Sequence, residues 1–199
     1  MKKILQGTKA LAIVLLLMLT ATMVNAANRF AVASGNWNSI LTWAATSGGA
    51  PGASVPIAGD VVTIEGGFTV TITANAACAT LNVNTGSLVV GGFDLVVTGT
   101  TTINGTVTVN NVTGAKTFDN LVINTGGVFN STVDEAFSLT GSLTVNGTGS
   151  LTSGLGAWTF SGTSTLGGTG SATISNADFT TDYTNSGTYT FADVDMAGG

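Results

Sequence analysis

The chain has 199 residues, ten acidic and five basic side chains, a net charge of −5 at pH 7, one cysteine and no histidine. The missing histidine excludes histidine metal sites and Ser-His-Asp or Cys-His catalysis, and the acidic balance disfavours nucleic acid and anionic lipid as partners. Cys78 has no second cysteine to pair with, and its apolar-leaning surroundings predict a small buried residue.

Residues 1–26 have the pattern of a cleaved secretion signal. A basic start at Lys2, Lys3 and Lys9 precedes an apolar run over 10–19, and a Val-Asn-Ala cleavage site closes the segment. The apolar run is shorter than the roughly 20 residues that a membrane span needs. We therefore expect an exported protein with no membrane span after signal cleavage; the alternative is a signal anchor that stays attached.

Residues 27–60 differ from the rest of the chain, because they contain both prolines and two of the three tryptophans. Stacked repeats need an end cap that hides the apolar surface of the first repeat. We interpret 27–60 as an N-terminal cap in which Trp37 and Trp43 form the plug. The alternative is that both rings are exposed and stack on sugars, which would make them glycan contacts.

Residues 61–199 repeat one short phrase, in which two apolar-x-apolar strands flank a centre of Asn, Gly or both. The copies cover 62–70, 81–90, 101–109, 121–128, 143–151, 166–174 and 183–191. The central asparagines are Asn84, Asn104, Asn124, Asn146 and Asn185. The first three lie about 20 residues apart, and a fixed period of this size predicts a solenoid.

This repeat predicts an all-β fold, a single-stranded right-handed parallel β-helix (β-solenoid) of about seven coils. Alternation along a strand sends Ile103, Val107 and Val109 inward and Thr106 and Thr108 outward. A β-sandwich is the alternative fold for so many short strands, but it does not require an Asn-x-Gly centre at a fixed interval.

The Asn-x-Gly centre suits a sharp corner between two short strands. Glycine accepts a positive φ freely, and asparagine tolerates it better than most residues. Stacked asparagine side chains can also hydrogen-bond from coil to coil. We expect the five central asparagines to form a structural turn ladder.

The outward residues of the second strand of each unit form a Thr-rich array. Aligned by unit, the outward pairs read Gly67/Thr69, Ser87/Val89, Thr106/Thr108, Gly127/Phe129, Ser150/Thr152, Ser171/Thr173 and Thr188/Thr190. Such an array resembles the ice-binding surface of β-solenoid antifreeze proteins, although Val89, Gly127 and Phe129 interrupt it. The alternative is that threonine is simply a favourable solvent-facing strand residue.

Carboxylates are the remaining candidates for catalysis or calcium binding. The pairs near one another in sequence are Asp134/Glu135, Asp178/Asp182 and Asp193/Asp195. A two-carboxylate hydrolase would need a preorganised pair, and calcium would need a dense oxygen loop. Because carboxylates at turns and on surfaces more commonly cap backbone groups or solubilise the protein, we expect no catalytic residue, no metal site and no cofactor.

Two stretches carry a family resemblance: SGNWNSILTW, and then VPIAGDVVTIEGGFTVTI. They resemble the opening of large bacterial cell-surface β-helix proteins and are similar to the eight-glycine extracellular β-helix domain. The matching positions are Trp37, Trp43, Pro56, Gly59, Asp60, Val62, Ile64, Gly67 and Val70. The resemblance covers roughly residues 34–145 and implies an exported, adhesin-like protein, often longer than this chain and ending in a sorting domain.

The expected function is therefore a secreted structural or adhesin-like segment of a bacterial cell surface, without catalytic activity. The alternatives are a carbohydrate-binding or carbohydrate-active β-helix and, as a minor one, an ice-binding solenoid. The partners we expect are surface glycans or other surface proteins. Because 61–199 ends without a clear cap, we also expect a truncated or open C-terminal end that stacks on further coils.

Overall fold

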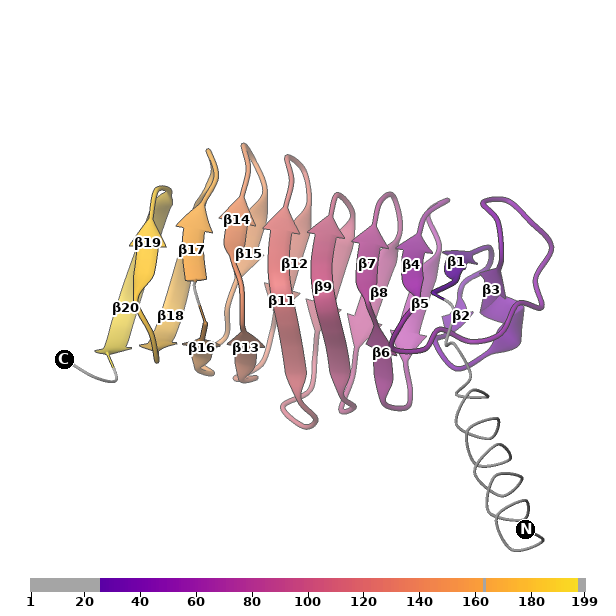
Figure 1. Cartoon of the computed structure of the whole chain (residues 1–199), viewed down its shortest axis with the longest axis horizontal. Helices are drawn as coiled ribbons and strands as arrows, with labels where there is room; N and C mark the ends of the chain where they lie inside the picture. Colours follow the sequence, from indigo (N-terminus) through magenta and orange to yellow (C-terminus); the bar gives the residue numbers. More distant parts are fainter. Residues whose placement is uncertain (1–25, 163, 197–199) are drawn as a thin grey trace, which may run out of the picture.

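The computed structural model describes residues 26–162 and 164–196, which form one rod of stacked coils (Figure 1). The predicted signal peptide, 1–26, lies outside the described residues except for its last residue. Each coil runs through three short strands, and each strand pairs in parallel with its counterparts in the coils before and after. This is the predicted β-solenoid of about seven coils, so the β-sandwich alternative is wrong.

The strands form three faces along the rod. Face A comprises β4 (Val61–Ile64), β7 (Thr80–Val83), the second half of β9 (Leu95–Ile103), the second half of β11 (Lys116–Ile123), β14 (Leu143–Val145), β17 (Ser164–Gly167) and β19 (Tyr183–Asn185). Face B comprises β5 (Thr69–Ile72), β8 (Ser87–Val90), β10 (Thr106–Val109), β12 (Val128–Ser131), β15 (Ser150–Thr152) and the first halves of β18 (Ser171–Phe179) and β20 (Thr188–Met196). Face C comprises β6 (Ala76–Cys78), β13 (Phe137–Leu139), β16 (Trp158–Phe160), the first halves of β9 and β11, and the second halves of β18 and β20.

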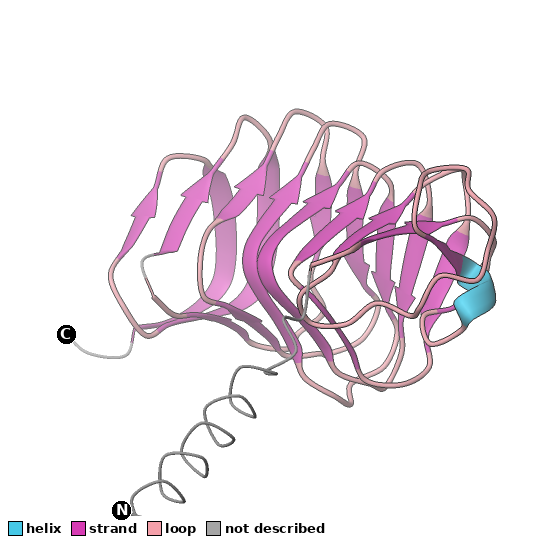
Figure 2. Ribbon diagram, turned by 45° about the vertical axis from the view of Figure 1, so that its right-hand side comes forward, coloured by secondary structure: helices cyan, strands magenta, loops and turns pink. Residues whose placement is uncertain are grey.

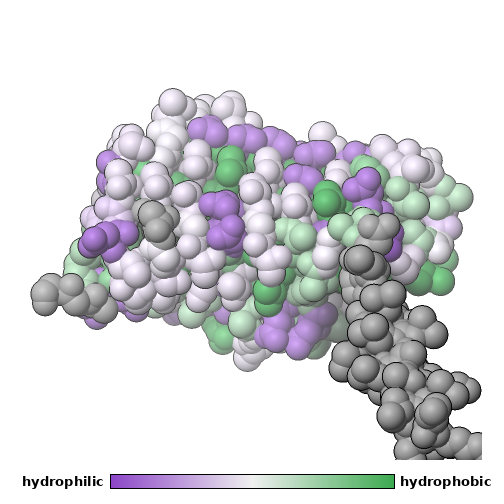
Figure 3. Space-filling model, viewed as in Figure 1, coloured by the Kyte–Doolittle hydropathy of each residue, from purple (hydrophilic) through white to green (hydrophobic). Residues whose placement is uncertain are grey.

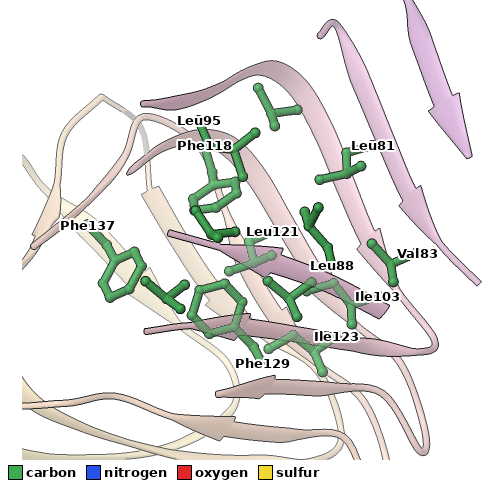
Figure 4. Packing of buried hydrophobic residues seen from close by; sticks show 14 of the residues in the cluster. Leu81, Val83, Leu88, Leu95, Ile103, Phe118, Leu121, Ile123, Phe129 and Phe137 are labelled. Carbon is green, nitrogen blue, oxygen red and sulfur yellow. The ribbon is translucent and has the colours of Figure 1, made fainter. Parts of the chain in front are cut away.

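The core is a set of columns in which one apolar side chain stacks on its counterpart in the next coil. Residues at alternate strand positions turn inward (Figure 4), as the period of two dictates. Ile103, Val107 and Val109 are all 0–1% exposed, which confirms the predicted alternation in the third unit. Cys78 lies fully buried in the same core, as predicted.

The later coils replace aliphatic residues with aromatic ones. A continuous series of ring contacts, with centroids 4.1–6.4 Å apart, runs through Phe118, Phe129, Phe137, Trp158, Phe160, Phe179 and Tyr183. Offset and edge-on ring pairs add to the stabilisation that comes from burial itself. The stacked rings therefore hold the C-terminal half of the rod together.

The N-terminal segment covers the edge of the first coil. Strand β1 (Asn28–Ala31) pairs in parallel with β4 and antiparallel with β3 (Trp43–Ala44), while β2 (Gly35–Asn36) pairs in parallel with β5. A single 3-10 turn, η1 (Ile40–Thr42), lies at this end of the rod (Figure 2). These strands satisfy backbone groups that an open sheet edge would leave unpaired.

At the opposite end, the last coil has neighbours on one side only. Within the described residues β20 pairs with β18 alone. Val194 and Met196 are 42% and 55% exposed, although both occupy columns that point inward in the preceding coils, where Ala177 and Phe179 are buried. Within the described residues, the rod therefore has one covered end, at β1–β3, and one open end, at β20.

Candidate functional site

The asparagine ladder lies at the corner where face A ends. Asn104 Nδ2 donates to Asn84 Oδ1 over 3.2 Å, Asn124 Nδ2 to Asn104 Oδ1 over 2.9 Å, and Asn146 Nδ2 to Asn124 Oδ1 over 3.0 Å. The two middle amides, Asn104 and Asn124, thus donate to the coil before and accept from the coil after, while Asn84 accepts and Asn146 donates at the two ends of the ladder. The predicted ladder is confirmed for these four residues.

Two parts of the ladder prediction are wrong. Asn185 is in register with Leu166, and Leu166 with Leu143, so it occupies an inward column and not the ladder position. In addition, none of the described non-glycine residues has a positive φ. The asparagines therefore act through their side-chain amides and not through an unusual backbone conformation.

Glycine is needed at the corners chiefly because adjacent coils approach closely there. A Cβ on Gly105 would lie 2.3 Å from the carbonyl oxygen of Gly86, and one on Gly127 would lie 2.2 Å from that of Ile103. Gly126 has a φ of 82°, a conformation that favours glycine. The first demand comes from stacking and the second from the local turn, so the corner motif is structural.

Trp37 and Trp43 lie inside the N-terminal segment, 3% and 0% exposed. Their ring centroids are 5.3 Å apart in an edge-to-face arrangement, and Trp43 Nε1 donates to the Trp37 carbonyl oxygen over 2.7 Å. A sugar needs an exposed ring face, and neither tryptophan has one. The interpretation of these two residues as glycan contacts is therefore wrong, because burial in the capping segment uses both rings.

Asp60, in the stretch that carries the family resemblance, is a buried anchor for the N-terminal segment. Its Oδ1 accepts from Ala27 N over 2.9 Å, its Oδ2 accepts from Ile57 N over 3.1 Å, and Arg29 Nε lies 3.4 Å from Oδ2. A buried carboxylate is tolerated when it is paired and hydrogen-bonded in this way. Asp60 therefore fastens the segment to the first coil.

A second buried ion pair was not predicted from the sequence. Lys116 Nζ lies 3.6 Å from Glu135 Oε1, and the two side chains are 0% and 3% exposed. Nζ also donates to the carbonyl oxygens of Thr113 and Gly114 over 2.6 and 2.9 Å. Burial raises the pKa of Glu135 above its ordinary value, while the ammonium of Lys116 partly offsets that rise.

The other carboxylates lie at the surface. Asp134 Oδ1 accepts from Leu155 N over 2.9 Å, and Asp178 and Asp195 are neighbours in register on face C. Asp182 is exposed in the turn before β19. Within the described part of the chain, no three Asp, Glu or Cys side chains are grouped so that they could hold a metal ion.

The Thr-rich array lies on face B, and the strand register changes its membership. The predicted outward pair Gly67/Thr69 is wrong, because Thr69 and Thr71 are the outward residues of β5. The predicted outward pair Gly127/Phe129 is also wrong, because Phe129 is fully buried and Val128 and Asn130 are the outward residues of β12. The two outward rows read Thr69, Ser87, Thr106, Val128, Ser150, Ser171, Thr188 and Thr71, Val89, Thr108, Asn130, Thr152, Thr173, Thr190.

A cavity of about 460 Å³ opens where the N-terminal segment meets the first corner of the solenoid. Its polar lining includes Glu65, Ser47 and Thr85, and its apolar lining includes Phe68 and Val32. Ser47 Oγ donates to Glu65 Oε1 across the cavity wall. The site was not predictable from the sequence, because its walls come from four segments that are separated along the chain.

Comparison with known proteins finds no match: no protein-family model, no curated protein and no solved structure is similar to this chain. Within residues 26–162 and 164–196, no helix is long and apolar enough to cross a membrane. The inferences about function therefore depend on the residues and geometry described above.

Proposed function

We propose that the protein is a secreted, adhesin-like structural segment of a bacterial cell surface and that it has no catalytic activity. The observation that supports this most is the regular rod itself, in which every coil directs short polar side chains outward at a fixed spacing. Its surface is largely of intermediate hydropathy, with only scattered strongly hydrophilic or hydrophobic residues on the face shown in Figure 3. Such a surface suits a structural segment that acts as a spacer and contacts other surfaces.

Export is the first test of this proposal. The full chain would be expressed in a bacterial host with an epitope tag after Gly199, and the cell fractions analysed by mass spectrometry and by protease treatment of whole cells. The expected product lacks residues 1–26 and is accessible to the protease. A full-length product retained in the cytoplasm would overturn the proposal.

The open end of the rod supports a second element of the proposal, stacking on a further coil. Val194 and Met196 continue inward columns but are exposed, and β20 presents an edge that can accept another strand. In the purified protein the further coil would come from a second copy. Light scattering should show association that increases with protein concentration. Val194→Lys should reduce this association, whereas the control Val112→Lys, at a position elsewhere that is 58% exposed, should not. A monomer at all concentrations would contradict stacking.

The corrected register of face B favours ice binding as a second candidate function. With Phe129 in the core and Thr71 outward, five coils present two hydroxyl side chains each on this face. Measurements of thermal hysteresis and ice-crystal shaping would test this candidate function. Thr108→Tyr changes the centre of face B, and Thr144→Tyr on face A is the control. Absence of both effects in the unmodified protein would exclude this candidate.

A further inference from the structure

We propose that the cavity between the N-terminal segment and the first corner binds a neutral saccharide unit. This inference rests on the proposed surface-contact function, since a surface protein of this kind meets glycans. It places the sugar site away from Trp37 and Trp43, whose rings are buried. The walls of the cavity are the loop at 47–49, the corner at 65–68 and Thr85 of the next coil.

The cavity has the size and position of a ligand site. Its volume of about 460 Å³ lies within the range of roughly 300–1,000 Å³ that is usual for small-molecule sites. Ala31 forms part of its apolar wall and is fixed by the pairing of β1 with β3 and β4. The β1 wall of the site is therefore held by sheet hydrogen bonds, and the loop at 47–49 is closed by the hydrogen bond from Gly49 N to the Thr46 carbonyl oxygen.

The polar groups of the cavity match a ligand that carries several hydroxyls. The Glu65 carboxylate has two oxygens with about four acceptor positions, and the hydrogen bond from Ser47 Oγ occupies one of them. Thr85 Oγ1 accepts from Gly66 N over 3.0 Å, and a hydroxyl that accepts one hydrogen bond can still donate its own proton. The site thus offers both hydrogen-bond acceptors and a donor.

The remaining lining selects a neutral sugar over an anion. Phe68 is half-buried in the wall, and its ring lies so close to Gly66 that a Cβ there would be 2.8 Å from Phe68 Cε2. An apolar wall beside a few convergent polar groups suits the alternating C–H and O–H surface of a sugar. None of the residues that line the cavity is cationic, so the Glu65 carboxylate disfavours uronates, sialic acids and phosphates.

Direct binding measurements on the purified signal-free protein test this inference. The probes are glucose, galactose, mannose and N-acetylglucosamine with their short oligosaccharides, titrated to about 10 mM and followed by ligand-observed NMR and calorimetry. We expect saturable binding of at least one neutral probe. Glu65→Ala and Phe68→Ala should each weaken it by about tenfold or more.

Matched controls separate loss of the site from loss of the fold. Phe93→Ala removes another phenylalanine, 39% exposed at a different corner, and should leave binding unchanged. Glu65→Gln keeps the side-chain shape and serves if the alanine variant does not fold; it should also weaken binding. No saturable binding of any neutral probe, binding of calcium alone, or binding unchanged in the Glu65 and Phe68 variants would overturn the inference.

The two proposals can fail separately. An exported protein that binds no sugar would overturn the saccharide site and leave the surface function standing. A protein that binds a sugar through Glu65 and Phe68 but stays in the cytoplasm would overturn the surface function and leave the site standing.

Discussion

The buried pair of Lys116 and Glu135 gives the sharpest prediction about stability. At 3.6 Å, two unit charges attract by about 5 kcal/mol at an effective dielectric constant of about 20. Desolvation of both groups opposes this attraction, so the intact pair adds little net stability. Removal of one partner is different, because it leaves the other charge buried and unpaired.

We expect Lys116→Met to lower the free energy of unfolding by about 3–5 kcal/mol, the usual result of breaking a buried ion pair. Glu135→Leu should also be strongly destabilising. The double variant should lie within about 1–2 kcal/mol of the unmodified protein, since it leaves no buried charge. Urea unfolding followed by circular dichroism measures all four proteins of this cycle.

The pH dependence of Lys116→Met follows from the raised pKa of Glu135. Without the lysine, nothing offsets the effect of burial, so the folded-state pKa lies still further above the ordinary value of 4.5. A raised carboxyl pKa contributes stability below the unfolded-state pKa, and this contribution is lost as the pH rises through the folded-state value. The penalty of Lys116→Met should therefore be smaller near pH 4 than near pH 7, at about 1.4 kcal/mol per unit of pKa shift.

Two results would refute this reasoning. If the effects of Lys116→Met and Glu135→Leu simply add in the double variant, the two side chains are not coupled. If the penalty of Lys116→Met does not change between acidic and neutral pH, Glu135 is not the buried group that carries the unpaired charge.

Three further predictions concern the core and the ladder. Thr101 is fully buried and its hydroxyl has no hydrogen-bond partner, so Thr101→Val should raise the free energy of urea unfolding by about 1–2 kcal/mol; a decrease would show that the hydroxyl is satisfied. Asn104→Ala removes two ladder hydrogen bonds and should lower the melting temperature, corresponding to about 1–3 kcal/mol, whereas Asn185→Ala, outside the ladder, should change it little; equal effects would contradict the ladder. Burial raises the pKa of Cys78 to about 12, so iodoacetamide should modify it only after unfolding in urea, and rapid labelling of the folded protein would contradict its place in the core.

The fold was predictable because the same pattern of apolar residues and asparagines repeats along the sequence. Asn84, Asn104 and Asn124 recur at a constant interval, and the apolar residues on either side alternate with a period of two. A short strand of this kind can bury its apolar side only against a copy of itself. The architecture therefore follows from periodicity alone, without any knowledge of individual contacts.

The predicted inward and outward assignments are wrong where the length of the corner changes from one coil to the next. Two residues separate Asn84 from Ser87, whereas three separate Asn124 from Val128. A change of one residue exchanges the inward and outward sets of a strand, and an alignment on glycine positions does not detect it. For this reason the aligned sequence predicts Phe129 at the surface, whereas its side chain is buried in the core.

The buried Lys116–Glu135 ion pair and the cavity at Glu65 could not be predicted from the sequence for a different reason. Lys116 and Glu135 are neighbours only because Phe137, two residues after Glu135, stacks on Lys116 in the next coil, and their separation of 19 residues in the sequence does not show this. The cavity at Glu65 likewise exists only once the N-terminal segment has folded back onto β4 and β5. Periodicity predicts which residues stack, but it does not predict what the spaces between non-repeating segments contain.

The positions of the three tryptophans allow the unfolding of different parts of the rod to be followed by fluorescence. Trp37 and Trp43 lie in the covered end, while Trp158 lies in the fifth coil with its ring 4.5 Å from that of Phe137. Solenoids can lose terminal repeats before the remainder unfolds, because each repeat contacts only its neighbours. Emission from a protein that keeps only Trp158, compared with one that keeps only the N-terminal pair, would therefore report whether the rod melts as one unit or shortens from one end.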